Sequence, residues 1–287
     1  MTAASSGRVE QVLRSIKRLR PLPANTTRLL SEVDNPESST SSVARLIAID
    51  QALTAYVLQV ANSAYLGYSS DCTSPKDAVV RLGFKQVRSL VIGLTASGPL
   101  SQRLVGYRLG NHGLWSHSTA VAATSHWLAT IFRYPDPEEA YSAGLLHDLG
   151  KLVLDQFVMA DYEKIMAAMR AHDIPMWQVE EELYGMDHAN VGGHIAELWD
   201  FPSVLADAIR HHHAPHQSQV RQKLTAIINL ANGIIADDSP VQLPMTLNRD
   251  IHPETLRILG IDLNGLDKIK SRHPEAMITY QARQLPV

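Results

Sequence analysis

His147 and Asp148 stand side by side in the stretch AGLLHDLGKLVLD, residues 143–155, which is otherwise mainly apolar. Burying an imidazole or a carboxylate costs free energy unless it is paired, so these side chains must face solvent, form hydrogen bonds or bind a metal ion. Together they offer a neutral nitrogen donor and an anionic oxygen donor. Adjacent residues on a helix point about 100° apart. Both can therefore serve one ion only at the edge of a helix, or they can bridge two ions.

Histidine is concentrated in the centre of the chain. Eleven of the thirteen histidines lie within residues 112–216. For any single histidine, a place on a helix surface or a hydrogen-bonded place in the core is the more common role. His212 and His213 have a further alternative, because the dipole of the predicted helix 203–213 stabilises cations at its C-terminal end. The cluster as a whole nevertheless makes metal chemistry worth testing.

Charge and composition narrow the classes of partner. The 287 residues are 45% hydrophobic and 19% charged, with a net charge of −3, so the chain lacks the broad basic surface that neutralises nucleic-acid phosphates. Nucleic acid is therefore disfavoured as a partner. No segment reaches eighteen uncharged apolar residues and the N-terminus has no signal-peptide core, which disfavours membrane spanning and secretion. The single cysteine, Cys72, forms no internal disulfide, and a cytoplasmic location is expected.

Apolar residues recur at helical spacing along the chain, and no alternating run indicates a strand. We therefore expect an all-α fold. Pro75 is expected to open a short helix that Gly83 closes, with a second helix following directly. The segment 237–253, with three prolines, is predicted to be a connector. Other helices are predicted over residues 112–133, 136–148, 151–157, 160–172, 175–184, 187–199, 203–213, 220–236, 253–259 and 264–281.

Motifs in two parts of the chain resemble one family. The N-terminal half contains LIAIDQALTAYVLQVANSAYLG (46–67) and SPKDAVVRLGFKQVRSLVIG (74–93), which resemble the opening of the HDOD domain, the HD-related output domain of bacterial signalling proteins. The central part contains LWSHS, AGLLHDLGKL, DHANVGGHIAELWDFP and DAIRHHHAP, in that order. These resemble the metal motifs of the wider HD phosphohydrolase superfamily. The resemblance covers residues 21–216.

The resemblance implies a metal site. Imidazole and carboxylate donors suit Fe, Mn, Zn, Ni or Co better than Ca or Mg. In HD enzymes that are active, such ions activate water and clamp a phosphate, so that nucleotides or cyclic dinucleotides are hydrolysed. The family's Ala-Ile-x-x-His-His pattern begins at Ala208, which leaves His211 outside the site. The implied metal ligands are His117, His147, Asp148, His188, His212 and His213.

The sequence departs from the superfamily pattern at its closing aspartate. The best-aligned residue is Asn232, which supplies only a neutral carbonyl oxygen and so removes one negative charge from the site. In another register Asp237 or Asp238 would substitute. The region after HHHAP also lacks the elements that mark the HD-GYP phosphodiesterases. Lys151, three residues after Asp148, could bind a phosphate, although a solvated lysine at a helix end is the more common role.

Two functions follow from the resemblance. The first is a regulatory or signal-transduction output module without efficient catalysis and without an assigned catalytic residue, which retains most HD-type ligand positions. Its expected partners are other signalling proteins of the receiver-domain, sensor-kinase or cyclase type, with a nucleotide ligand as an open alternative. The second is a metal-dependent phosphohydrolase or phosphodiesterase that acts on nucleotides or cyclic dinucleotides. A helical scaffold with incidental histidines would require the ordered motifs to be accidental.

The expected architecture is a multi-helix HDOD domain with an N-terminal helical subdomain. Residues 1–20 are expected to form an N-terminal helix and residues 21–216 the HDOD domain. Residues 217–287 are expected to form a C-terminal helical extension that packs on the main domain.

Overall fold

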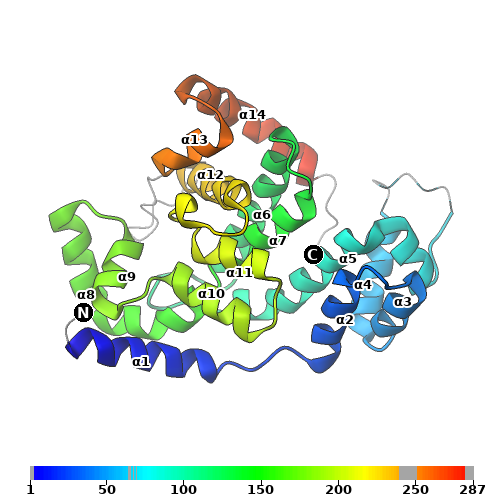
Figure 1. Cartoon of the computed structure of the whole chain (residues 1–287), viewed down its shortest axis with the longest axis horizontal. Helices are drawn as coiled ribbons and strands as arrows, with labels where there is room; N and C mark the ends of the chain where they lie inside the picture. Colours follow the sequence, from blue (N-terminus) through cyan, green and yellow to red (C-terminus); the bar gives the residue numbers. More distant parts are fainter. Residues whose placement is uncertain (1–2, 64–65, 67, 69, 239–250, 282–287) are drawn as a thin grey trace. The chain divides into compact units, whose positions relative to one another are not determined.

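The computed structural model describes residues 3–63, 66, 68, 70–238 and 251–281 (Figure 1). This part of the chain is helical and contains no β-strand, so the predicted all-α fold is confirmed. The helices are α1 (Ala3–Lys17), α2 (Ala24–Asp34), α3 (Thr40–Ile47), α4 (Gln51–Ala61), α5 (Pro75–Leu100), α6 (Gly113–Ile131), α7 (Pro137–Leu146), α8 (Lys151–His172), α9 (Met176–Tyr184), α10 (His188–Leu198), α11 (Ser203–Arg210), the 3₁₀ helix η2 (Pro215–Gln217), α12 (Gln222–Asp238), α13 (Pro253–Leu259) and α14 (Leu263–Gln281).

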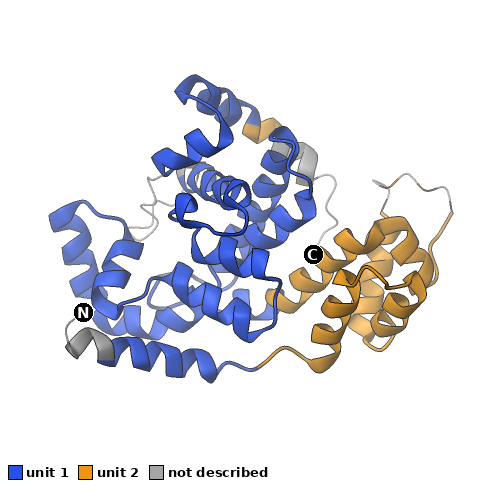
Figure 2. Ribbon diagram, in the orientation of Figure 1, with its two compact units in different colours: residues 1–20, 97–272 blue, residues 21–96, 273–287 orange. Residues whose placement is uncertain are grey.

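The chain divides into two compact units, which Figure 2 colours separately. Unit 1 comprises residues 1–20 and 97–272, and unit 2 comprises residues 21–96 and 273–287. Every metal ligand that the sequence predicts lies in unit 1. The candidate site is therefore built by one unit alone.

Unit 2 contains helices α2, α3 and α4 and the greater part of α5. The predicted helix break at Gly83 is confirmed. Gly83 has φ +75°, a left-handed conformation that side-chain-bearing residues rarely adopt, and it separates two helical segments within α5. Earlier in the chain, α3 begins at a capping box in which the backbone N–H of Ser39 and that of Ser42 each donate to the side chain of the other residue.

Unit 1 is built around α6, which packs against α7 and α12. Leu114, Val121 and Leu128 of α6 are fully buried. Helix α7 comes close to α6 at Gly144, where a Cβ atom would lie 2.6 Å from Ser125 Oγ. This contact holds the C-terminal end of α7, and the residues that follow it, beside α6.

A second close contact joins the start of α8 to the start of α10. A Cβ atom on Gly150 would lie 1.9 Å from the carbonyl oxygen of His188 and 2.7 Å from the backbone nitrogen of Gly192. The small residues that the sequence places at both positions are therefore required for this approach. The consequence is that His188 is held beside the turn that carries Asp148.

Two predicted helices end earlier than expected. His147 and Asp148 lie in the turn between α7 and α8 instead of inside a helix. His212 and His213 lie in the turn after α11, one turn beyond its last residue. In α8 the predicted break between two helices is present, but it lies at Asp161 (φ −109°, ψ 17°), a few residues later than the predicted gap at 158–159. In the first two cases the turn lets neighbouring side chains point in directions that a regular helix does not allow.

The predicted connector 237–253 lies mostly outside the described residues. After it, α13 packs against α12. The backbone N–H of His252 and the hydroxyl of Thr255 both donate to Asn229 Oδ1, at 3.0 and 2.6 Å. Asn229 in turn donates to the carbonyl oxygen of His212 at 2.8 Å. These bonds fix the turn that presents His212.

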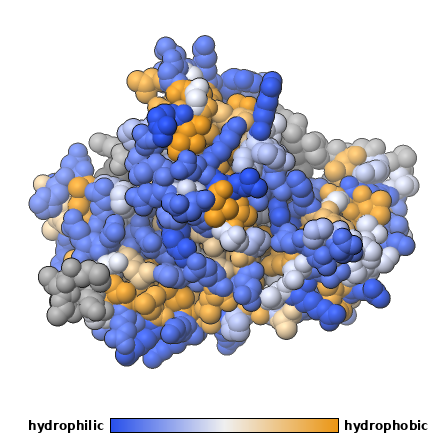
Figure 3. All heavy atoms as spheres, viewed as in Figure 1, coloured by the Kyte–Doolittle hydropathy of each residue, from blue (hydrophilic) through white to orange (hydrophobic). Residues whose placement is uncertain are grey.

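Hydrophilic side chains cover most of the face in Figure 3, with apolar side chains in smaller groups. Within the described residues, no helix has the length and apolar character that crossing a membrane requires.

The contact between α8 and α10 yields a stability prediction. Gly150→Ala places a methyl group inside van der Waals contact with backbone atoms, which cannot move aside as a side chain would. We expect a loss of about 1–3 kcal/mol in the free energy of unfolding, measured by urea denaturation. Gly98→Ala is the control, because nothing lies within 4 Å of a Cβ there and alanine favours the helix. Equal stabilities for the two variants would contradict the close approach.

Candidate metal centre

Six side chains from four places in unit 1 converge on one centre. His117 comes from α6, His147 and Asp148 from the turn before α8, His188 from the first residue of α10, and His212 and His213 from the turn after α11. They form two groups, within each of which one donor atom per residue lies within 4.8 Å of the others. The first group is His117, His147 and Asp148, and the second is His188, His212 and His213.

Asp148 joins the two groups. Its Oδ2 lies 3.4 Å from His117 Nε2 and 3.3 Å from His147 Nε2, and its Oδ1 lies 3.2 Å from His188 Nε2. The carboxylate is only 1% exposed. One anionic side chain therefore faces both sets of imidazoles, an arrangement that can serve one ion or bridge two.

The backbone fixes the tautomers of two histidines. His147 Nδ1 lies 2.8 Å from the carbonyl oxygen of Gly144, and His212 Nδ1 lies 2.8 Å from that of Ile209. A carbonyl oxygen only accepts hydrogen bonds, so each Nδ1 carries a proton, and in a neutral imidazole the free lone pair is then on Nε2. Both Nε2 atoms are buried without a hydrogen-bond partner, and so is Asn232 Oδ1.

These unpaired acceptors are a test of whether the residues fit a metal ion. A buried acceptor without a partner costs about 1–3 kcal/mol. A cation bound among these atoms would satisfy them together. The donor set, imidazole nitrogen with carboxylate oxygen, is one that transition metals bind. The residues therefore fit the metal that the sequence predicts.

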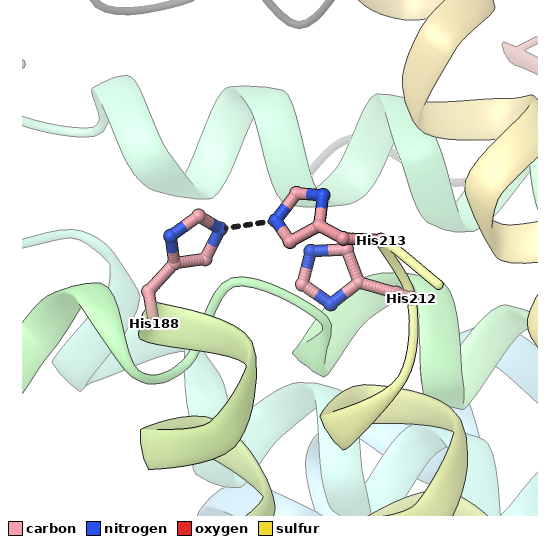
Figure 4. Close-up of side chains that lie close together, drawn as sticks. All are labelled: His188, His212 and His213. Atoms are coloured by element: carbon pink, nitrogen blue, oxygen red, sulfur yellow. Dashed lines mark hydrogen bonds between the residues drawn. The ribbon is translucent and has the colours of Figure 1, made fainter. Parts of the chain in front are cut away.

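His188 and His213 face each other, with their Nε2 atoms 2.9 Å apart (Figure 4). His188 Nδ1 lies 2.6 Å from Glu180 Oε2, so this nitrogen donates to a carboxylate. The ring of His213 stacks on Trp177, with centroids 5.2 Å apart and an angle of 11° between the planes. Glu180 thus fixes the ring of His188 and Trp177 that of His213, and the Nε2 atoms of both rings face the centre.

Glu180 was missed by the sequence analysis. It belongs to α9 and is fully buried. Glu180 is the first of three consecutive glutamates in the sequence MWQVEEELY. A run of acidic residues usually indicates a solvent-exposed helix face. The helical period held a signal, since Glu180 stands four residues from both Met176 and Tyr184 and therefore shares their face of α9, which is buried.

Lys151 forms an ion pair with Asp148 in this structure. Its Nζ lies 2.6 Å from Asp148 Oδ2, and its side chain is largely buried. The phosphate-binding role that the sequence suggests for Lys151 would require this contact to open. As it stands, the ammonium group balances the charge of the carboxylate.

Burial and neighbouring charge set the protonation states. Burial lowers the pKa of His117 to about 3, and also lowers the pKa values of His212 and His213. Burial alone would raise the pKa of Asp148, but His147 and Lys151 hold it well below its usual range. These are the neutral imidazoles and the anionic carboxylate that metal binding requires. For His188, burial acts against the Glu180 charge, and the pKa rises to about 9.

Asn232, predicted as the degenerate ligand position, lies on α12 beside His117 and is buried. The structure therefore brings it to the edge of the centre. His211 is outside, as expected, because its Nδ1 lies 3.1 Å from Asp207 Oδ1 and 3.0 Å from the Asp207 carbonyl oxygen. The side chains of Asp237 and Asp238 lie outside the described part of the chain.

Solved structures of similar proteins share the fold. A protein from Shewanella amazonensis SB2B, named as a candidate phosphohydrolase, is 29% identical with a TM-score of 0.68, and the match covers 95% of this chain and 98% of that one. An HDOD domain protein of unknown function from Geobacter sulfurreducens is 23% identical with a TM-score of 0.71 and 96% and 95% coverage. A candidate signal transduction protein from Marinobacter aquaeolei VT8 is 22% identical with a TM-score of 0.68, covering 97% of this chain and 66% of that one.

Sequence comparison gives the family. An uncharacterized protein from Treponema pallidum (strain Nichols) is 24% identical over 217 residues, and the match spans 74% of this chain but only 41% of that relative. Residues 19–215 match the HDOD domain family. With the motifs, the all-α fold and the family match in agreement, the chain belongs to the HDOD domain family.

Proposed function

We propose that this protein is a signal-transduction module that binds a divalent metal ion at the six converging side chains and does not turn over a substrate efficiently. One observation carries the proposal. The donor set holds a single carboxylate, Asp148, and that carboxylate is already paired with Lys151 at 2.6 Å. The superfamily's second carboxylate is replaced by Asn232.

The charge balance favours a single ion. Two divalent ions bring four positive charges into a buried centre, where Asp148 supplies one negative charge and Lys151 adds a positive one. Uncompensated charge in a low-dielectric interior is strongly unfavourable. One ion held by imidazoles needs far less compensation. Hydrolysis that depends on a pair of metal ions is correspondingly disfavoured.

The types of donor atom indicate which metal ions the site would bind. Neutral imidazoles outnumber carboxylates in this set, which favours Zn, Fe, Ni, Co or Mn over Mg and Ca. A bound ion would supply Lewis acidity and positive charge at the centre. The chain's own residues supply the tautomers, the orientation and a buried site that largely excludes water.

A metal ion at this place suits a signalling role. The ligands come from α6, the turn before α8, α10 and the turn after α11, so one ion ties four parts of unit 1 together. Binding to the folded state alone stabilises that state by mass action. The rigid surface that results is what we propose partner proteins recognise, with receiver domains, sensor kinases and cyclases as the expected classes. A nucleotide is the alternative ligand.

A metal-dependent phosphohydrolase is the second candidate. It is favoured by the bridging position of Asp148 between two donor groups and by the similarity to the Shewanella protein named as a candidate phosphohydrolase. In that case Lys151 would leave Asp148 and bind phosphate. Nucleotides and cyclic dinucleotides are the substrates to test.

The first experiment measures metal content and turnover together. We expect one equivalent of a transition metal in the purified protein, by elemental analysis, and no hydrolysis of nucleotides or cyclic dinucleotides. His147→Ala and His213→Ala should each weaken metal binding at least tenfold, because each removes a donor from the centre. His194→Ala is the control, since the side chain of His194 is 40% exposed on α10 and its Nδ1 lies 3.4 Å from Glu197 Oε2. Metal-free protein would contradict the proposal, and turnover lost in His147→Ala would favour the hydrolase.

Lys151→Met separates metal affinity from stability. Without the ammonium group, Asp148 Oδ2 becomes free for a metal ion and a repelling charge disappears, so the affinity should rise about tenfold or more. The metal-free protein should lose about 2–4 kcal/mol of unfolding free energy, because a buried carboxylate loses its partner. Metal titration and urea denaturation check the two effects, whose opposite signs are the test. An unchanged or lower affinity would show that Lys151 does not compete with the metal.

Asn232→Asp tests the missing carboxylate. Asn232 lies beside His117 and is buried, so aspartate should add a second carboxylate to the ligand set. We expect the stoichiometry to rise from one metal equivalent toward two, measured by titration with Zn²⁺ or Mn²⁺. Asn111→Asp is the matched control, because it is the same substitution at an exposed residue in the segment before α6. A stoichiometry of one in Asn232→Asp would contradict the charge argument.

A further inference from the structure

Glu180 uses both of its carboxylate oxygens inside the protein, next to the metal centre. Oε2 accepts the backbone N–H of His188 at 2.8 Å and lies 2.6 Å from His188 Nδ1. Oε1 accepts the hydroxyl of Tyr107 at 2.7 Å. All three residues are buried, with exposed fractions of 0 to 3%. Burying a carboxylate this completely costs free energy unless its hydrogen bonds inside the protein replace those it would make with water.

We propose that Glu180 is a positioning residue of the metal centre and that Tyr107 completes it. The inference rests on the proposed function, because it concerns how tightly the same site binds its ion. Neither residue touches the ion. Both act through His188.

The first step of the argument is the orientation of His188. The bond from Nδ1–H to Glu180 fixes the ring so that Nε2 faces Asp148 Oδ1 at 3.2 Å and His213 Nε2 at 2.9 Å. A second bond, from the backbone N–H of His188 to the same oxygen, fixes the start of α10 as well. Metal-binding histidines are commonly held in this way through the nitrogen that does not bind the metal.

The second step is charge. His147 and His212 use backbone carbonyls for the same bond, whereas His188 uses a carboxylate. A carboxylate accepts a stronger hydrogen bond than a neutral carbonyl and makes the imidazole a better donor. It also places a second negative charge one residue away from the ion. Glu180 thus supplies part of the compensation that Asn232 does not.

The third step is what holds Glu180. Tyr107 lies in the segment between α5 and α6, and three successive backbone N–H groups there, of residues 105–107, donate to the Asp155 carboxylate at 2.8 to 3.2 Å. Gly106 permits this contact, because a Cβ atom would lie 2.2 Å from the Asp155 carbonyl oxygen. The Tyr107 hydroxyl is therefore presented to Glu180 by a rigidly anchored turn.

Glu180→Gln and Glu180→Ala separate charge from orientation. Glutamine can still accept a bond from His188 Nδ1–H but carries no charge, so we expect the Zn²⁺ affinity to fall about tenfold. Alanine removes both contributions, and we expect a loss of up to about 100-fold. Tyr107→Phe should give a smaller loss in the same direction. Competition with a chelator of known affinity measures all three variants.

The chain offers a matched control. Tyr134 donates its hydroxyl to Glu139 near the start of α7, which is the same pair of residue types without a histidine beyond it. Glu139 precedes His147 by eight residues, or about 12 Å along the helix. Tyr134→Phe and Glu139→Gln should leave the Zn²⁺ affinity within twofold of the wild type. If the Glu180 variants match these controls, the proposal is wrong.

A second measurement needs no metal. In ¹⁵N-labelled metal-free protein, Nδ1 of His188 should carry a proton that exchanges slowly with water, with the signal assigned by its loss in His188→Gln. We expect slow exchange to persist in Glu180→Gln and to disappear in Glu180→Ala. An unprotonated Nδ1 in the wild type would overturn the positioning role. A wild type that binds no Zn²⁺ but shows this protected proton would overturn the proposed function and leave the Glu180–His188 bond established.

Discussion

A buried carboxylate at the junction of three chain segments is the constraint on which this structure depends. Asp148 is almost completely removed from water, and an isolated charge there would be prohibitively costly. Lys151 and the facing imidazoles are arranged around it so that each oxygen meets a positive or protonatable group. The helices of unit 1 therefore place these polar groups around one buried position. Packing alone would not require polar residues there.

The close helix packing of unit 1 brings these groups together, and it also leaves buried hydrogen-bond acceptors unpaired. Glycines at 144, 150 and 192 let neighbouring helices come into close contact. As a result, the turns before α8 and after α11 lie in the interior of unit 1. The same approach buries imidazole and amide acceptors that find no hydrogen donor. Each costs stability unless a cation pairs with it, so a metal ion bound at this centre would stabilise this unit. A signalling module can use such coupling, because its surface then depends on the state of its centre.

The sequence predicted the parts of this arrangement that depend on local pattern. The helical period gave the all-α fold, Gly83 gave the break in α5, and the ordered motifs gave six side chains that do converge. It misplaced His147, Asp148, His212 and His213 inside helices, because apolar periodicity continues through turns that tertiary bonds create. Glu180 and Tyr107 were missed, since their link spans 73 residues of chain and only the fold reveals it.

The most direct test of this account is anomalous X-ray diffraction from crystals of the purified protein, recorded at the absorption edge of the metal it contains. The account predicts one strong peak between His147, His212 and Asp148, about 2.0–2.2 Å from the nearest ligand nitrogens and oxygens. No peak at this centre, or a peak only at surface histidines such as His194, would contradict it.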